Sequence, residues 1–421
     1  MPRPMSLRFP SFLRHVGPGV VTGAADDDPS GIATYTQAGA QFGTGLLWTV
    51  LLSLPFMIAI QLVSARIGRV TGKGLAANLR DHTPRWCLGS MVALLVVANT
   101  INIAADIAAM GEALQLVVGG GQHFHAVAFG LLTVLLQVFV PYRKLAPILK
   151  WLTLFLFAYV IAVFTVQVHW AQVLHDLVVP ALQWTSSYWM MIVALLGTTI
   201  SPYLFFWQAS QEVEELRLRG GSLGSQADIR RDLRRVRSDT FIGMFFSNAV
   251  AFFIMVLGGV VLYAAGIRDI TTAAQAAQAL RPLAGDFAFL LFAGGVIATG
   301  MLAVPVLASS AAYAVAEAFG WEDGLERQWF EARRFYAIIV IATAVGTGLD
   351  FTPIDPMKAL YWSAVINGVV AVPIMAGMML LASKKAVMGN FTSAWLTRWF
   401  GWGAVAVMAI AVLMMLKDLA F

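Results

Sequence analysis

Long runs of apolar residues, separated by short polar segments, make up most of the chain. A helix needs ~20 residues to cross the hydrocarbon core of a bilayer, and a hydropathy window of about that size finds repeated candidates. Helices suit this environment because they satisfy their own backbone hydrogen bonds where water is absent. The pattern predicts eleven membrane spans, at roughly 16–43, 45–67, 88–118, 125–142, 149–169, 187–210, 240–266, 286–316, 335–350, 358–382 and 400–416.

The basic residues give an independent test of this number, because Lys and Arg collect in the cytoplasmic loops of membrane proteins. With the N-terminus inside, 24 of the 28 Lys and Arg residues fall in predicted cytoplasmic segments. Adding or removing one span would disrupt this alternation. We therefore expect an all-α polytopic membrane protein with its N-terminus in the cytoplasm and its C-terminus outside.

The composition agrees with a protein embedded in the lipid bilayer. Hydrophobic residues make up 59% of the chain, charged residues only 12%, and the mean hydropathy is +0.75. The single cysteine, Cys87, excludes a disulfide or a Cys-based metal cluster within one chain. The arginine-rich segment at 211–239 also contains acidic residues and lies in a predicted cytoplasmic loop, so we expect no nucleic-acid partner.

The sequence DDDPSG (26–31) places three carboxylates inside the first predicted span. An ionisable residue at membrane depth costs at least ~2.5–3.5 kcal/mol on insertion scales, so it is retained where it faces a cavity, a partner or an ion. Pro29 lacks a backbone donor and disfavours the helical state of Asp28, and Gly31 weakens the next turn. We expect the first helix to break at Asp28, where a carboxylate beside free carbonyls forms a cation site.

A second break is predicted in the sixth span, within GTTISPYLFFWQ (197–208). Pro202 on its own would indicate no more than a kink, which is common in membrane helices. Transporters built from inverted repeats, however, often carry interrupted helices at matching positions in their two halves. Spans one and six each begin a block of five, so the two predicted breaks correspond.

These motifs resemble the NRAMP family of divalent-metal transporters. The family pattern of Gly-Pro-Gly, followed some ten residues later by Asp-Pro-Gly-Asn, is matched by GPGVVTGAADDDPSG (17–31), and its sixth-helix Met-Pro-His by the segment 201–203. The third span contains NIAADIAAMGEA (102–113), which is similar to the family's Asp-Leu-Ala-Glu-Val-Ile-Gly stretch and aligns Asp106 with its Asp.

The resemblance implies a LeuT-like fold in a single transmembrane domain, 1–421. Its two inverted five-helix repeats would cover roughly 16–169 and 187–382, with an extra helix at roughly 400–416. It also implies a multi-pass protein of the plasma (inner) membrane that carries divalent metal cations into the cytoplasm by alternating access. Neither a cofactor nor an enzymatic activity is expected, and the oligomeric state stays open, with a monomer plausible.

The resemblance also implies a metal site. Family members bind the ion through the Asp and Asn of the first helix, a backbone carbonyl in the sixth, and the sulfur of its Met. Carried over to this chain, Asp28 keeps the carboxylate and Thr198 takes the carbonyl position, whereas Gly31 replaces the Asn and Ser201 the Met. A thioether selects softer transition metals, and oxygen ligands suit Mg²⁺ or Mn²⁺. We therefore expect Mg²⁺ or Mn²⁺, as in the magnesium-transporting branch related to NRAMPs, with Fe²⁺ as an alternative.

Proton coupling is expected to be weak or absent. The family moves protons through the first-helix Asp, two His positions in the sixth helix, and an Asp and a Glu on the third. The His positions are Tyr203 and Gln208 here, the Glu position is Ala109, and only Asp106 remains on the third helix. Histidine is the side chain that most readily exchanges protons near neutral pH. The alternative is a proton-coupled Mn²⁺/Fe²⁺ symporter of the usual NRAMP kind.

Supporting roles at the site are expected for Asp27, Tyr203, Asp106 and Asn367. Successive helical residues point about 100° apart, so three adjacent aspartates face one ion only if the helix is unwound there. Four asparagines, at 99, 102, 248 and 367, lie at membrane depth. Most should form interhelical hydrogen bonds, and Asn367 is the one expected to contribute to the site.

Three other classes of protein remain to be weighed. An amino-acid transporter on the same fold would meet its substrate's carboxylate with helix N-termini, and Asp28 would repel that group. A passive channel would need a continuous pore. An intramembrane enzyme would need a nucleophile and a base, and Asp28 and Asp106 could in principle form a carboxylate pair for this purpose.

Overall fold

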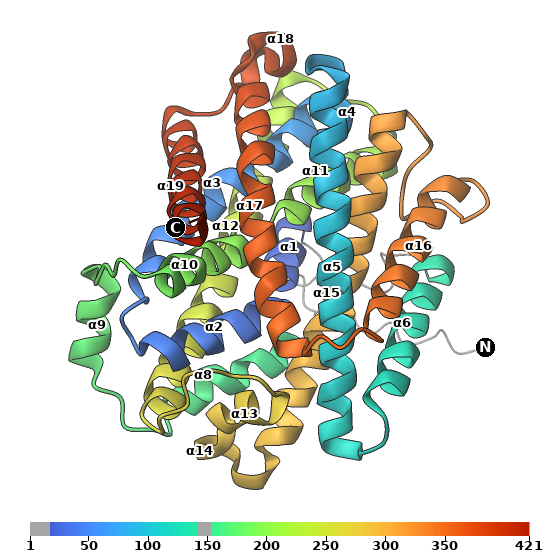
Figure 1. Cartoon of the computed structure of the whole chain (residues 1–421). Helices are drawn as coiled ribbons and strands as arrows, with labels where there is room; N and C mark the ends of the chain where they lie inside the picture. Colours follow the sequence, from blue (N-terminus) through green and yellow to red (C-terminus); the bar gives the residue numbers. More distant parts are fainter. Residues whose placement is uncertain (1–16, 141–152, 421) are drawn as a thin grey trace, which may run out of the picture.

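The computed structural model describes residues 17–140 and 153–420, and every regular element in these ranges is a helix (Figure 1). The first half contains α1 (Pro18–Asp26), α2 (Pro29–Phe42), α3 (Trp48–Thr71), α4 (Leu75–His82), α5 (Arg85–Val118), α6 (Gln122–Phe139), α8 (Phe157–Val163) and α9 (Trp170–Val178). The second half contains α10 (Ser186–Thr199), α11 (Pro202–Leu218), α12 (Gln226–Leu257), α13 (Ala273–Ala277), α14 (Arg281–Ala284), α15 (Ala288–Phe319), α16 (Arg333–Leu349), α17 (Pro356–Ser383), α18 (Lys385–Met388) and α19 (Trp395–Ala420).

Eight helices in the described ranges are long and apolar enough to cross a membrane, if α10 and α11 are taken together. They correspond to eight of the eleven predicted spans. Of the other three, the first span is divided between α1 and α2, the ninth is the 17-residue α16, and the fifth begins before residue 153, outside the described ranges. Eleven spans therefore stays a prediction.

Both predicted helix breaks are present, and they are built in the same way. Asp28, between α1 and α2, is extended with φ −71° and ψ 171°, and Pro29 starts α2. Ser201, between α10 and α11, is extended with φ −76° and ψ 129°, and Pro202 starts α11. Proline disfavours the helical state of the residue before it and fits the first position of a helix, which explains both breaks.

The broken helices occupy the interior of the bundle, where α5, α15 and α17 lie beside them and α19 lies at the edge (Figure 1). Glycines allow the close approach of these helices. A Cβ at Gly23 of α1 would lie 2.6 Å from the Gly243 Cα of α12. A Cβ at Gly197 of α10 would lie 2.8 Å from the Gly368 Cα of α17. Because small residues let membrane helices pack backbone to backbone, these contacts fix the position of each half-helix at its break.

The beginning of α1 is held by a side chain from another helix. The Asp239 carboxylate of α12 accepts hydrogen bonds from the Gly17 N–H at 3.1 Å and from the Gly19 N–H at 2.7 Å. The first N–H groups of a helix have no intrahelical partner and carry a partial positive charge, so a carboxylate there both satisfies and stabilises them. Asp239 therefore acts as the N-terminal cap of α1, from more than 200 residues away in the sequence.

We predict that Asp239→Ala will lower the free energy of unfolding by ~1–2 kcal/mol, because it leaves two buried N–H groups without an acceptor. The measurement is the thermal unfolding midpoint of the purified protein in detergent. Asp239→Asn keeps one acceptor oxygen, so it should lower the unfolding midpoint by less than Asp239→Ala. Equal midpoints for wild type and Asp239→Ala would contradict the capping role.

Candidate metal site

Asp28 lies at the first break and caps the beginning of α2. Its Oδ1 accepts hydrogen bonds of 2.7 Å from the Ser30 hydroxyl and the Gly31 backbone N–H. Its Oδ2 accepts a bond of 3.1 Å from the Asn102 amide of α5. Only 2% of Asp28 is exposed. The carboxylate is thus buried and fixed in orientation, and no basic side chain forms an ion pair with it in the described part of the chain.

At the second break, Ser201 and Thr198 lie together as predicted. Ser201 Oγ is 2.9 Å from the carbonyl oxygens of both Gly197 and Thr198. A hydroxyl has one hydrogen, so the two carbonyls share it. The Thr198 hydroxyl is buried and interacts with the hydroxyl of Tyr35 on α2. The carbonyl expected to bind the ion is therefore occupied by the Ser201 hydrogen in this structure.

Gly31 connects the two breaks. A Cβ at this position would lie 3.2 Å from Thr198 Oγ1, 3.3 Å from the Tyr35 ring and 3.4 Å from the Asp26 carbonyl oxygen. Since Gly31 N–H also bonds Asp28, the four predicted site residues form one group. A side chain as large as Asn at position 31 would press against Thr198, which agrees with the absence of a side chain there.

Two neighbouring helices, α5 and α17, bring amides and a further carboxylate to this group. Asn102, which donates to Asp28, accepts a 2.8 Å hydrogen bond from Ser363 of α17. One turn along these helices lie Asp106 and Asn367 on the same faces. Both amide atoms of Asn367 are buried without a hydrogen-bond partner. Asp106 is buried and lies within reach of the backbone N–H of Ser30, in the first turn of α2. Asp106 is close enough to Asp28 to interact with it electrostatically.

The sequence alone did not place Asn102 at the site. An interhelical hydrogen bond was expected for it, and the structure shows that the partner is Asp28 itself. The four-residue spacing between Asn102 and Asp106 was the available signal, because it puts both side chains on one helix face. Asn99 and Asn248 do form the expected interhelical bonds, to the carbonyls of Leu307 and Val50.

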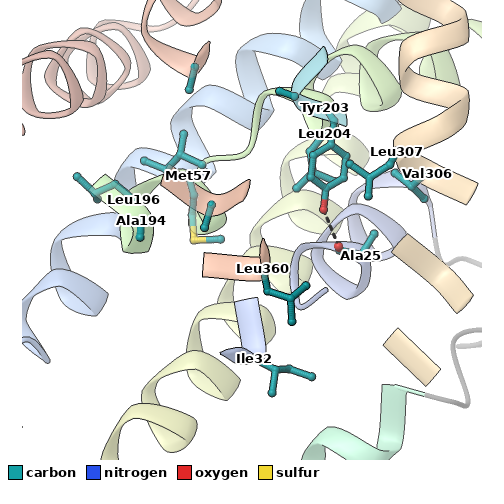
Figure 2. Close-up of a cluster of buried hydrophobic side chains, with 14 of the residues drawn as sticks. Ala25, Ile32, Met57, Ala194, Leu196, Tyr203, Leu204, Val306, Leu307 and Leu360 are labelled. Atoms are coloured by element: carbon teal, nitrogen blue, oxygen red, sulfur yellow. Dashed lines mark hydrogen bonds between the residues drawn. The ribbon is translucent and has the colours of Figure 1, made fainter. Parts of the chain in front are cut away.

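Tyr203 links the two broken helices. Its hydroxyl donates a 2.8 Å hydrogen bond to the Ala25 carbonyl in the last turn of α1, and both residues lie among buried apolar side chains (Figure 2). The Tyr203 carbonyl in turn accepts a 2.7 Å bond from the Ser310 hydroxyl of α15. Tyr203 thus satisfies a carbonyl exposed by the first break and joins the start of α11 to the end of α1.

Asp26 and Asp27 are directed toward α12, away from the partners of Asp28. The Ser247 hydroxyl lies 2.6 Å from Asp26 Oδ2 and 3.2 Å from Asp27 Oδ1. Asp28, by contrast, bonds Asn102 on α5. The three adjacent carboxylates therefore do not converge on one point, as their angular spacing along the chain predicts.

The site is closed and consists of oxygen donors. Asp28, Thr198 and Ser201 are each at most 2% exposed. Within the described ranges, no three His, Cys, Asp or Glu side chains gather in a metal-binding group. An ion at the breaks would be bound by one carboxylate together with carbonyl, hydroxyl and amide oxygens, a donor set that suits hard divalent cations.

Known proteins are similar to this chain over most of its length. A curated relative from Klebsiella pneumoniae, the divalent metal cation transporter MntH, is 28% identical over 405 residues, which cover 94% of this chain and 92% of the relative.

Solved structures share the fold. The manganese transporter of Eremococcus coleocola, in complex with an aromatic bis-isothiourea compound, superposes with a TM-score of 0.73 at 19% identity, over 98% of this chain and 87% of that one. MhsT in complex with L-phenylalanine superposes with a TM-score of 0.63 at 12% identity, over 95% and 98% of the two chains. These similarities confirm the predicted LeuT-like fold.

The family model described as natural resistance-associated macrophage protein-like matches residues 19–418, nearly the whole chain. The chain therefore belongs to the Nramp family, whose members are metal transporters and not enzymes.

Proposed function

We propose that the protein carries a hard divalent cation, Mg²⁺ or Mn²⁺, into the cytoplasm through the site at Asp28, with weak or no proton coupling. One observation carries the proposal: Asp28 is a buried carboxylate that forms no ion pair in the described part of the chain, and Gly31, which it binds, lies beside Thr198 of the second broken helix. We place the protein in the inner membrane. The distribution of Lys and Arg fits an orientation with the N-terminus in the cytoplasm and the C-terminus outside.

The proposed ligands are the Asp28 carboxylate, the Thr198 carbonyl and the Ser201 hydroxyl, with the Asn367 amide oxygen as a further donor. Asn367 is 1% exposed and lacks a hydrogen-bond partner, so a ligand would satisfy an otherwise costly buried group. Entry of the ion requires the Ser201 hydrogen to leave the Thr198 carbonyl. The Ser201 oxygen and that carbonyl then both face the ion.

The proposed choice of ion follows from the oxygen atoms that would bind it. Carboxylate, carbonyl and hydroxyl oxygens suit Mg²⁺ and Mn²⁺, whereas the thioether that would favour softer metals is absent at position 201. Gly31 supplies no side-chain ligand, which suits an ion that keeps several of its own waters, as Mg²⁺ usually does. The relatives named for divalent metal cation and manganese transport support Mn²⁺ as well, and Fe²⁺ is the third candidate.

The side chains around the site support transport without protons. Tyr203 donates to the Ala25 carbonyl and the Gln208 amide donates to Thr240 at 3.1 Å, so neither position offers an imidazole for proton transfer. The driving force would then be the ion gradient and the membrane potential, which supplies ~2.3 kcal/mol per charge per 100 mV. Proton-coupled transport of Mn²⁺ or Fe²⁺ is the alternative.

We predict that Asp28→Asn will reduce cation uptake into liposomes to the level of protein-free vesicles. The substitution keeps the size of the side chain and an acceptor for the Gly31 N–H, and removes the charge that binds the ion. Asp81→Asn, at an exposed position on α4, is the matched control and should transport like wild type. Uptake by a folded Asp28→Asn protein at the wild-type rate would refute the site.

Replacing Ser201 with Met should shift the preference from Mg²⁺ toward Mn²⁺ and softer metals, because a thioether sulfur joins the donors. The readout is the ratio of Mn²⁺ to Mg²⁺ uptake, which we expect to rise by ~10-fold, the change produced by 1.4 kcal/mol of differential binding. Ser201→Leu controls for size, since it has no sulfur. If Ser201→Met and Ser201→Leu gave the same ratio, the argument from the ligands would be wrong.

Proton coupling is tested with wild-type protein in liposomes that contain one dye for the metal and another for pH. We expect saturable Mg²⁺ entry at a clamped membrane potential without acidification of the interior. Mn²⁺ entry with acidification, and without Mg²⁺ flux, would show instead a proton-coupled transition-metal importer.

A further inference from the structure

The side chains of Asp26 and Asp27 share one hydrogen-bond donor, which is not among the donors to Asp28. The Ser247 hydroxyl of α12 lies within hydrogen-bond distance of Asp26 Oδ2 and of Asp27 Oδ1. It has one hydrogen for the two carboxylates. The other oxygen of Asp26, Oδ1, is buried and has no hydrogen-bond partner. Most of the hydrogen-bond acceptor positions on the two carboxylates, Asp26 and Asp27, are therefore unused.

The pair is also without a compensating charge. Asp26 is fully buried, Asp27 is 3% exposed and Ser247 2%. None of the ion pairs in the described part of the chain includes Asp26 or Asp27. Buried charges are normally paired with an opposite charge or bound to a metal, because an isolated charge in a low-dielectric interior costs several kcal/mol or more.

A cavity lies beside the pair. It has a volume of about 230 Å³ and is lined by Asp27 and Ser247, by Gly23 and Ala24, and by apolar side chains of α8 and α12. Gly23 and Ala24 belong to the last turn of α1, where the backbone carbonyls lack intrahelical partners and carry partial negative charge. The cavity has room for an ion with several waters.

We propose that Asp26, Asp27 and Ser247 form a second binding site for a hard divalent cation, between α1 and α12 and separate from the site at Asp28. Two carboxylates match the charge of one divalent ion. The hydroxyl and the carbonyls at the end of α1 supply further oxygen ligands of the kind that Mg²⁺, Mn²⁺ and Ca²⁺ bind. The two sites lie on opposite sides of the first helix break, because Asp28 bonds α5 whereas this pair bonds α12. The inference extends the proposed function to a second ion.

The test counts bound Mn²⁺ per chain in the purified full-length protein in detergent, from the electron paramagnetic resonance signal of free Mn²⁺ at equilibrium. We expect two ions per chain for wild type and for the exposed-acid control Asp81→Asn. Asp27→Asn, which keeps the shape of the side chain, should bind one ion. Asp28→Asn should also bind one, and the double variant none.

The variants separate the two proposals. If Asp28→Asn kept two ions while Asp27→Asn lost one, the transport site would be misplaced and the second site would stand. If wild type bound one ion, or if Asp27→Asn kept both, the second site would be refuted. Should Asp27→Asn not fold, Ser247→Ala serves in its place and should raise the Mn²⁺ concentration needed to fill the second site ~10-fold. No change in that concentration would refute the role of Ser247.

Discussion

The structure of the site depends on one hydrogen-bonded carboxylate. Asp28 caps α2 by accepting a hydrogen bond from the Gly31 N–H, and its other oxygen accepts one from the Asn102 amide of α5. The first interaction holds the helix break in place, and the second ties that break to the helix that also carries Asp106. A buried carboxylate without these donors would be far more costly. These two hydrogen bonds, together with the one from the Ser30 hydroxyl, reduce the cost of the buried charge and fix its orientation.

The helix breaks could be predicted from the sequence because their cause is local. In Asp28-Pro29 and Ser201-Pro202 the proline disfavours the helical state of the residue before it, and both of these residues are extended. The partners of the site could not be predicted in this way, since they come from distant helices. The Asn102 amide bonds Asp28 across 74 positions, and Asp239 caps α1 across 222. Such pairings depend on how the helices are arranged, which hydropathy does not encode.

Hydroxyl groups satisfy carbonyls at both helix breaks. The Ser201 hydrogen occupies the Thr198 carbonyl, and the Tyr203 hydroxyl occupies that of Ala25. Buried carbonyls without partners are costly, so these hydroxyls stabilise the two breaks. If an ion binds here as proposed, it would compete with the Ser201 hydrogen bond, which would weaken binding and favour release. A transporter benefits from this balance because an ion bound too tightly would not leave.

The contacts between α1 and α12 have a mechanical consequence. Asp239 holds the beginning of α1, Ser247 holds its end, and the Gly23–Gly243 contact lies between them. Three attachments along nine residues leave α1 little freedom to tilt on its own. Rotation about the two residues that link α1 to α2 must therefore either carry α12 along as one rigid body or break all three attachments together. These attachments favour movement of α1 together with α12 over movement of the half-helix alone.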